Sequence, residues 1–281
     1  MVTAVREGEW SWDPSLYGGS AAYYARGRVP YPDAVADSLA AALRLDSSGR
    51  LLDVGCGPGS LTLLLAPMVA EATGIDADRD MLSEAARLAA DTGVRNVSWR
   101  HLRAEDLPAG LGTYRLVTFA RSFHWMDRPR VAAAVHRMLD RDGACVHVHA
   151  ATHQGADTGQ VLLHPQPPRS DIAELVHRYL GPTRRAGRGR LPQGRPTDAD
   201  SVYRAAGFAG PHRIEVPGRA VTRAADDVVA AVFSRSSSAP HLFGDQRTAF
   251  VTELRQLLRD ASPTGLFSQP VREIALDIWR P

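Results

Sequence analysis

The sequence predicts an α/β fold, in which a doubly wound and mostly parallel sheet carries helices on both faces. Two observations support this prediction. Short apolar runs alternate with segments of helical period over residues 51–150. The first run, at 51–54, leads through a glycine-rich turn at 55–59 into a segment with helical spacing. A chain that alternates strands and helices in this way forms parallel strands joined by right-handed crossovers.

The elements follow in order. Helices are expected directly after the glycine turn and at about 33–45, 79–91 and 129–139, and strands at 51–54, 70–75, 97–102, 116–120 and 144–150. Beyond residue 151 we expect helices at about 170–180 and 198–206, a helical stretch at 222–262, and strands at 212–216 and 271–279. The excursion between the last two strands indicates a helical cap. The predicted regions are an N-terminal lid segment and helix (1–45), a ligand-binding core (46–150), and a C-terminal part (151–281) with the cap at about 222–270.

Composition restricts the class of protein. The chain has 281 residues, of which 44% are hydrophobic, and a formal net charge of +2, which is too small to indicate nucleic-acid binding. Every basic residue is an arginine, as expected of a GC-rich bacterial genome. No apolar run of about 18 residues indicates a membrane span. Two cysteines without metal or redox spacing, and an N-terminus without a signal pattern, predict a cytoplasmic protein.

The glycine turn is the strongest candidate for a ligand site. Gly55, Gly57 and Gly59 follow Asp53, whereas a dinucleotide fingerprint would need glycine where Ser60 stands. A strand, a tight turn and a helix bring a ligand close to the backbone. Asp76 ends the next strand, 19 residues after Gly57, where a carboxylate can accept hydrogen bonds from both hydroxyls of a ribose.

This pattern resembles the first motif of class I S-adenosylmethionine-dependent methyltransferases. Residues 30–150 resemble the small-molecule, trans-aconitate-like (type 11) subgroup, and the remainder does so only loosely. The resemblance implies a seven-stranded Rossmann-like sheet of order 3-2-1-4-5-7-6 with an antiparallel last strand. It also implies that S-adenosylmethionine is the cofactor and S-adenosylhomocysteine the product.

The resemblance also assigns roles to residues. The backbone at Gly55, Cys56 and Gly57 would approach the amino-acid head and the ribose, and Asp53 would meet the ammonium of the head directly or through water. Ala77 and Met81 would pack on the adenine, whose edge would meet the Ala104 amide and Glu105. Relatives often carry an acid where this chain has Arg103. The residues expected to bind the cofactor are Arg28, Asp53, Gly55, Cys56, Gly57, Gly59, Asp76, Ala77, Met81, Ala104, Glu105 and Arg121.

Residues 24–32, YARGRVPYP, resemble a segment that folds over the cofactor in the same subgroup. Arg28 aligns with the arginine of that motif and would bind the cofactor carboxylate bidentately. Val29 stands where the motif has proline, so the local backbone is expected to differ. The alternative is a helix entry with aromatic packing.

Residues 122–127, SFHWMD, resemble the sequence after strand four of the subgroup, which places His124 near the transferred methyl. Two interpretations remain open for His124: a base for a hydroxyl acceptor, or a pocket wall. A carboxylate acceptor needs no base. The expected residues on the substrate side are Tyr24, Tyr31, Ser122, His124, Trp125 and His149.

Other features predict less. His147, His149 and His153 lack a third zinc ligand at dependable spacing, so no metal is expected. The arginines of 184–195 predict a solvated loop, with attraction of an acidic substrate as the alternative. The favoured function is methylation of a small molecule, at oxygen before nitrogen or carbon. A nucleic-acid or protein methyltransferase, and a cofactor-binding protein with another chemistry or a regulatory role, are the alternatives.

Overall fold

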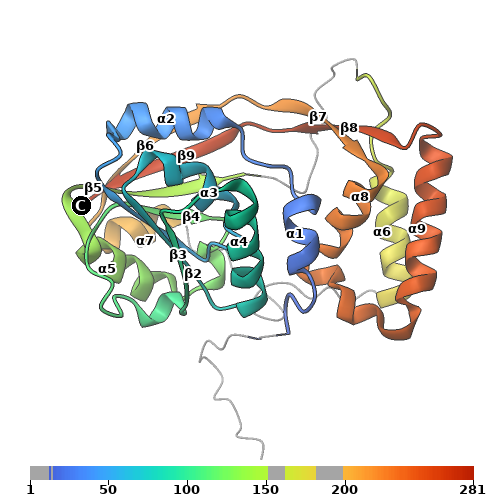
Figure 1. Cartoon of the computed structure of the whole chain (residues 1–281), viewed down its shortest axis with the longest axis horizontal. Coiled ribbons are helices and arrows are strands. Elements are labelled where there is room, and N and C mark those ends of the chain that lie inside the picture. The colour runs from blue at the N-terminus through green and yellow to red at the C-terminus, as the bar shows by residue number, and fades with distance from the viewer. Residues whose placement is uncertain (1–12, 14, 151–161, 182–198) are drawn as a thin grey trace, which may run out of the picture.

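The computed structural model describes residues 13, 15–150, 162–181 and 199–281 (Figure 1). Residues 1–12, His153 and the arginine-rich segment 184–195 lie outside the described residues. None of the helices in the described part of the chain is both long and apolar enough to cross a membrane.

The main sheet has seven strands in the order β3-β2-β1-β4-β5-β9-β6. The first five pair in parallel, whereas β9 is antiparallel to both β5 and β6. Because β9 is the last strand of this sheet, the predicted order 3-2-1-4-5-7-6 and the fold class are confirmed. The strands are β1 Arg50–Val54, β2 Glu71–Asp76, β3 Val97–His101, β4 Tyr114–Ala120, β5 Leu139–His149, β6 Ala209–Val216 and β9 Ile274–Arg280.

Helices cover both faces of this sheet, as its nearly continuous apolar central strands require. The cores of the two faces contain different helices, α2 and α3 in one and α5 and α7 in the other. Figure 1 shows α2 on one side of the sheet and α5 and α7 on the opposite side. These helices and α4 are α2 Asp33–Leu43, α3 Ser60–Leu65, α4 Arg79–Thr92, α5 Arg128–Met138 and α7 Ala199–Ala205.

A helical cap stands beside the sheet and has an apolar core of its own. It contains α6 Arg169–Leu180, α8 Ala225–Phe233 and α9 Arg247–Ala261, with a small antiparallel sheet of β7 Arg219–Ala224 and β8 Leu266–Val271. The helical prediction for 222–262 is wrong at its start, where β7 ends. The predicted strand at 271–279 is in fact the end of β8 followed by β9.

The lid segment contains a short helix, α1 Ala21–Gly27, which lies between the sheet and the cap in Figure 1. Gly27 lets α1 touch α8, because a Cβ there would come within 2.4 Å of the Ala230 carbonyl oxygen. Arg26 pairs with Asp227 at 2.7 Å, and Ser20 Oγ donates to the Phe233 carbonyl at 2.8 Å. The lid is therefore attached to the cap.

Candidate functional site

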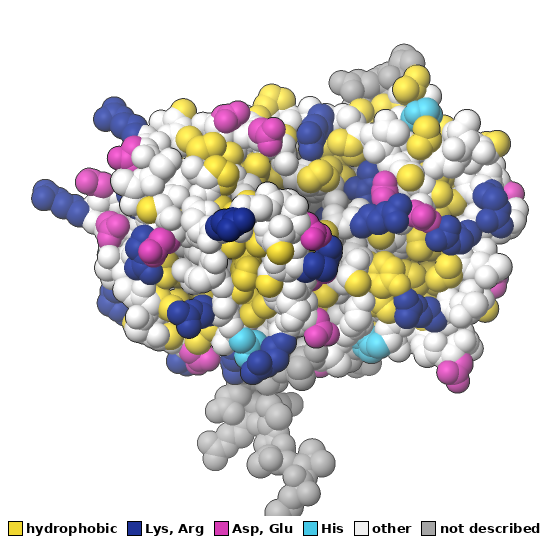
Figure 2. Space-filling view, viewed as in Figure 1, with side chains coloured by type: hydrophobic (Ala, Val, Ile, Leu, Met, Phe, Trp, Pro, Cys, Tyr) yellow, Lys and Arg dark blue, Asp and Glu magenta, His cyan; other side chains and the backbone are white. Residues whose placement is uncertain are grey.

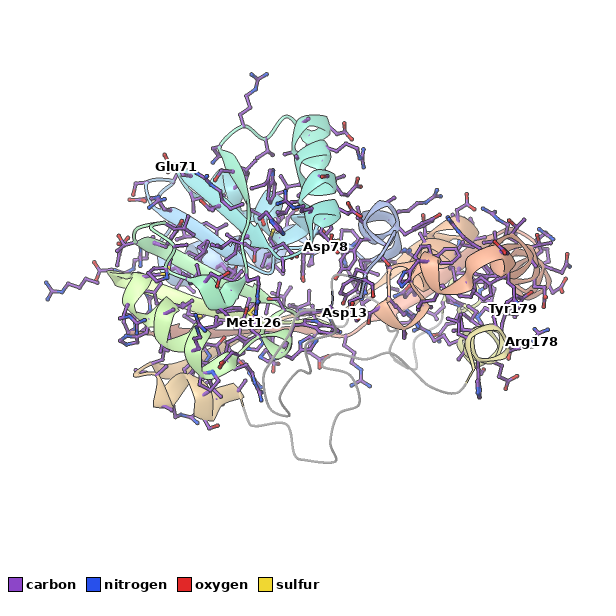
Figure 3. The ribbon with its side chains drawn as sticks, turned by 90° about the horizontal axis from the view of Figure 1, so that it is seen from below. Asp13, Glu71, Asp78, Met126, Arg178 and Tyr179 are labelled. Atoms are coloured by element: carbon purple, nitrogen blue, oxygen red, sulfur yellow. The ribbon has the colours of Figure 1, made fainter. Side chains whose placement is uncertain are left out.

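A cleft lies at the carboxyl ends of β1, β2 and β4 and extends to the lid. In an open α/β sheet ligands bind at the carboxyl ends of the strands, at the switch point where the strand order reverses. In this sheet the switch point lies between β1 and β4. In Figure 3, Asp78 at the start of α4 lies beside α1. The cleft is lined by Tyr17, Tyr24, Gly55, Gly57, Asp76, Ala77, Asp78, Met81, Leu102, Arg103, Ala104, Glu105, Ala120, Arg121, Ser122, Trp125 and Met126.

The glycine turn is bonded to β2 through its amides. The amides of Gly55 and Cys56 donate to the Ile75 carbonyl at 2.9 and 3.0 Å, and the Gly57 amide donates to Asp76 Oδ2 at 2.8 Å. These three donors therefore hold the turn against the strand. At Gly57, with φ of 54°, a Cβ would meet no protein atom within 4 Å. The turn leaves open space at this glycine.

Asp76 is the central polar group of the cleft. Its Oδ1 accepts from the Asp78 amide at 2.9 Å, and its Oδ2 accepts from Gly57. A carboxylate oxygen accepts more than one hydrogen bond, so both oxygens can still receive a ligand hydroxyl. Burial raises the pKa of Asp76 to about 6, although the two amides act in the opposite direction. The carboxylate is thus fixed in place and ionised at neutral pH.

The predicted adenine wall lies beside Asp76. Ala77 and Met81 line the cleft, and Asp78 holds the start of α4 by accepting from the Asp80 and Met81 amides at 2.9 and 3.2 Å. The buried Glu105 also lines the cleft but accepts from the Asp127 amide at 2.9 Å. Glu105 therefore also orients the loop before α5.

Asp53 does not line the cleft, so its expected contact with the ammonium, directly or through water, stays a prediction. Its carboxylate is 1% exposed, accepts from Thr62 Oγ1 at 2.6 Å and from Thr118 Oγ1 at 2.8 Å. These bonds join β1 to α3 and β4. Burial raises the pKa of Asp53, against the two threonine hydrogen bonds. Asp53 is a positioning residue behind the turn.

Gly59 and Cys56 likewise lie outside the lining. A Cβ on Gly59 would come within 2.4 Å of Trp99 Cη2, so this glycine lets the indole of β3 pack against the start of α3. The Cys56 thiol is buried, and burial raises its pKa well above the ordinary value. Both residues shape the turn from behind.

Arg28 lies outside the cleft lining, next to Tyr24. Its guanidinium is 4.6 Å from the centre of the Tyr24 ring and donates to the Ser234 carbonyl at 2.7 Å. Its Nε is buried and has no hydrogen-bond partner among the described residues. Tyr31 also lies outside the lining, and burial raises its pKa. The cofactor contact of Arg28 stays a prediction.

The segment after β4 contributes three of its predicted residues to the lining. Arg121 has a φ of 58° and donates to the Ala150 carbonyl at 2.6 Å, while Ser122 Oγ donates to the Val54 carbonyl at 2.6 Å. The Trp125 ring meets the Tyr17 ring edge-on at 6.0 Å. These contacts fix the wall opposite Asp76.

His124 does not line the cleft and is exposed at its outer side. Surrounding protein atoms lower the pKa of His124 to about 4, and the charges of Arg121 and Arg128 contribute. The imidazole is therefore neutral at pH 7 and is a weak base. Both interpretations of His124 stay predictions: Trp125 lines the cleft and His124 does not, and the lowered pKa makes the imidazole a weaker base.

His149 lies at the end of β5, away from the cleft. Its Nε2 is 2.9 Å from Asp277 Oδ2, and Asp277 also pairs with Arg213 at 2.6 Å. The ring stacks on His147 with centroids 4.3 Å apart. No group of three metal-ligating side chains suited to a metal ion occurs in the part of the chain that the structure describes. The substrate contact of His149 stays a prediction, and its Nε2 is already engaged by Asp277 of β9.

Sequence reasoning missed several lining residues. Asp78 carried a usable signal, because an aspartate before an amphipathic segment is a typical helix N-cap. Tyr17 carried none, since it stands in a segment without periodicity. Leu102, Ala120 and Met126 line the cleft because they flank predicted residues at the ends of strands and loops.

Fold and cleft together define a Rossmann-like α/β protein with a cleft beside its glycine turn. Residues 51–143 match a family model described as "Methyltransferase domain". The family resemblance given above is confirmed.

Named relatives agree with this assignment. The chain is 34% identical over 95 residues to the uncharacterized methyltransferase YcgJ of Bacillus subtilis, covering 34% of this chain and 38% of the relative. It is 31% identical over 159 residues to a trans-aconitate 2-methyltransferase of Pseudomonas paraeruginosa, covering 55% and 52%. A shorter match, 38% identical over 68 residues, is to a mouse tRNA (uracil-5-)-methyltransferase homolog A, covering 24% of this chain and 11% of that one.

The chain thus spans about half or less of the length of these relatives. The fold agrees with the crystal structure of YcgJ, with a TM-score of 0.50 at 17% identity, covering 89% of this chain and 99% of that one.

Proposed function

We propose that this protein transfers a methyl group from S-adenosylmethionine to a small molecule and releases S-adenosylhomocysteine. The observation that carries the proposal is the pairing, in one cleft, of the ionised Asp76 with the open space at Gly57. The matched methyltransferase domain includes both residues. Oxygen is the favoured acceptor atom, in a carboxylate or a hydroxyl, and nitrogen or carbon are the other choices.

The residues present fit this cofactor. Asp76 has acceptor capacity left for two ribose hydroxyls, and Ala77 and Met81 offer an apolar surface for the adenine. The space at Gly57 suits the part of the ligand nearest the turn. The buried Nε of Arg28 has no partner among the described residues and fits the carboxylate of the cofactor head. The Tyr24 ring stands next to the guanidinium and would move to admit it.

The bound cofactor would supply a methyl on a sulfonium, which an acceptor displaces in line. The part of the protein is to orient the acceptor and to exclude water. Tyr17, Tyr24 and Trp125 wall the cleft, and Tyr17 and Tyr24 belong to the lid segment tied to the cap. An acceptor that is ionised at pH 7 suits this site, because His124 is a weak base. This supports a carboxylate over a hydroxyl.

A small-molecule acceptor is supported by the match to a trans-aconitate 2-methyltransferase. The match to a tRNA methyltransferase homolog covers only 11% of that protein. In the face shown in Figure 2, arginine side chains are interspersed with acidic ones, which does not favour a polyanion. We propose a cytoplasmic location, in keeping with the two buried free cysteines.

Two measurements test the proposal. Calorimetric titration with S-adenosylmethionine and S-adenosylhomocysteine is expected to show binding, which Asp76→Ala abolishes and Asp80→Ala, an exposed neighbour, preserves. Mass spectrometry of a panel of small carboxylic acids and phenols is then expected to show a gain of one methyl group. Binding without any methyl gain would favour a cofactor-binding protein with another chemistry or a regulatory role.

A further inference from the structure

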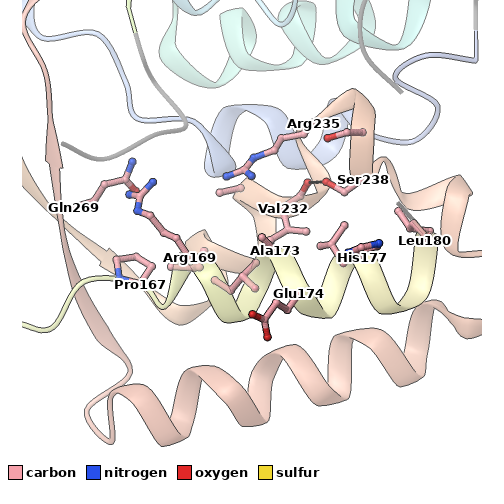
Figure 4. Close-up of a pocket in the computed structure, with 16 residues that line it drawn as sticks. Pro167, Arg169, Ala173, Glu174, His177, Leu180, Val232, Arg235, Ser238 and Gln269 are labelled. Carbon is pink, nitrogen blue, oxygen red and sulfur yellow. Dashed lines mark hydrogen bonds between the residues drawn. The ribbon is translucent and has the colours of Figure 1, made fainter. Parts of the chain in front are cut away.

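A second pocket lies within the cap, between α6, α8 and β8, and shares no lining residue with the cleft (Figure 4). We call it the cap pocket. Its walls are mixed, and their apolar part comes from Ile172 and Val176 of α6 and Val228 and Val232 of α8. Arg169 and Gln269 lie side by side at one end in Figure 4, and His177 lies near the other end, beside Leu180. The side chains of Arg169 and Gln269 therefore indicate which chemical group the cap pocket can bind.

Arg169 is the first polar group without a partner. Its side chain is half-buried, and it makes no hydrogen bond or ion pair to any residue in the described part of the chain. Its Nε is fully buried. Burial lowers the pKa of its guanidinium. By contrast, Arg178, which lies further along α6, pairs with Glu253 at 2.9 Å. A buried, unpaired cation is unfavourable, so an incoming anion would be strongly attracted.

Gln269 is the second such group. It lies on β8, is 6% exposed, and its amide makes no hydrogen bond to the described residues. Buried side-chain amides are normally hydrogen-bonded. Its NH₂ group can donate to the same anion as Arg169. The guanidinium of Arg235 is directed toward this end as well, whereas the Glu174 carboxylate points away from it in Figure 4.

We propose that the cap pocket binds a small organic carboxylate with an apolar body. The carboxylate would lie on Arg169 and Gln269, since a guanidinium fork beside an amide matches two planar oxygens. The aliphatic or aromatic body would lie between α6 and α8, toward Leu180. Mixed walls of this kind, with few polar groups at one place, are typical of small-molecule sites.

The cap pocket is close to the proposed reaction cleft. Ser237 and Ser238 line the cap pocket, while the neighbouring Ser236 lies close enough to Tyr17, which lines the cleft, to lower the pKa of its hydroxyl. The carboxylate is therefore either the methyl acceptor itself or a separate ligand. The site stands on its own observations and does not depend on methyl transfer.

The test uses the full chain with hexanoate and benzoate as probes, and hexanamide and benzamide as uncharged controls. We expect the carboxylates, but not the amides, to bind and to raise Tm. Arg169→Met is expected to weaken carboxylate binding at least tenfold, and Gln269→Met to weaken it less. Arg178→Met is the matched control and should leave binding unchanged. Equal binding of the amides, no carboxylate binding, or an unchanged Arg169→Met variant would each overturn the proposal.

Two further readouts guard the interpretation. Because the guanidinium of Arg169 is half-buried and has no partner among the described residues, Arg169→Met without ligand is expected to keep or raise Tm. A large loss would show that Arg169 has a structural partner. Saturating S-adenosylhomocysteine should leave probe binding in place, and competition between the two would overturn a separate site. Adding S-adenosylmethionine then distinguishes the two cases. Formation of a methyl ester of the probe identifies the carboxylate as the methyl acceptor, and binding without ester formation identifies it as a separate ligand.

Discussion

The amide of Gly57 donates a 2.8 Å hydrogen bond to Oδ2 of Asp76, so the glycine turn and the acid of β2 form one unit. The turn therefore holds the carboxylate in the orientation that a diol requires. It also means that a change in the charge of Asp76 alters both the ligand contact and the turn.

Acid is expected to weaken cofactor binding. Burial raises the pKa of Asp76 from 3.8 to about 6, so the free protein loses this charge as the pH falls through 6. The stability of the free protein changes in the opposite direction. Because the pKa of Asp76 is higher in the folded state than the ordinary 3.8, its contribution to the free energy of unfolding decreases as the pH rises from about 4 to about 6. Titration calorimetry with S-adenosylhomocysteine should show Kd rising by up to about tenfold per pH unit below 6.

Asp76→Asn supplies the comparison for that titration. Its affinity should be low and flat between pH 5 and 8, because an amide NH₂ would face one of the two backbone donors. Asp80→Asn, an exposed change on the same helix, should follow the wild-type curve. A wild-type Kd that stays constant from pH 5 to 8 contradicts the role of Asp76.

Gly57→Ala tests the open space at the turn. Gly57 and Gly93 both have positive φ, 54° and 72°, and at neither would a Cβ meet an atom within 4 Å. Each alanine should therefore cost about 1–2 kcal/mol in the free energy of unfolding, from backbone strain alone. Only at Gly57 does the Cβ enter the cleft. The cofactor Kd should rise at least about tenfold in Gly57→Ala, which corresponds to a loss of about 1.4 kcal/mol or more in binding free energy. In Gly93→Ala the Kd should stay unchanged.

The sequence predicted the core well, because local signals agree there. Apolar runs, glycine turns and helix ends place β1 to α4 within about two residues of the prediction. The two-stranded sheet of the cap was missed, since Arg219–Ala224 pairs with Leu266–Val271 across two helices and no local pattern marks that pairing. Helix α1 was missed for a related reason: it packs against α8, which is distant in sequence.

The site was predicted less completely than the fold. Asp76 lies where the motif places it, because the end of a strand fixes the side chain. Whether Asp53 faces a ligand depends on Thr62 and Thr118, which come from two other elements. Similarly, His149 is engaged by Asp277 from the antiparallel β9. Such partners can be assigned only when the strand order and register are known.

Gly59→Ala is expected to destabilise the fold far more than Gly93→Ala. Both have positive φ, but at Gly59 the new Cβ would come within 2.4 Å of Trp99 Cη2. Strain and overpacking together should cost about 3 kcal/mol or more. Chemical denaturation of the double variant Gly59→Ala/Trp99→Leu tests the cause. Its loss in the free energy of unfolding should be about 1–3 kcal/mol smaller than the sum of the losses in the two single variants. Simple additivity would mean that the indole is not the obstacle.

Arg28→Ala tests the lid prediction. We expect it to raise the Kd of S-adenosylhomocysteine markedly while leaving 5′-methylthioadenosine, which lacks the amino-acid head, unchanged. The reason is that the buried Nε has no described partner and suits only the carboxylate of the head. Arg26→Ala, which removes an exposed ion pair with Asp227, is the control for lid attachment. Equal weakening of both ligands would assign Arg28 to lid anchoring through Ser234.

His124 is expected to titrate far below neutrality. Partial burial of the ring lowers the pKa of His124 to about 4, and the charges of Arg121 and Arg128 act in the same direction. The imidazole therefore binds no proton at pH 7. An NMR titration of the ring Cε1–H signal, assigned with His124→Gln, measures this directly. The midpoint should lie near 4, and methyl transfer by His124→Gln should keep the wild-type pH dependence between 6 and 8. A midpoint near 6.5, together with a lost basic limb in the variant, would restore His124 as the base and favour a hydroxyl acceptor.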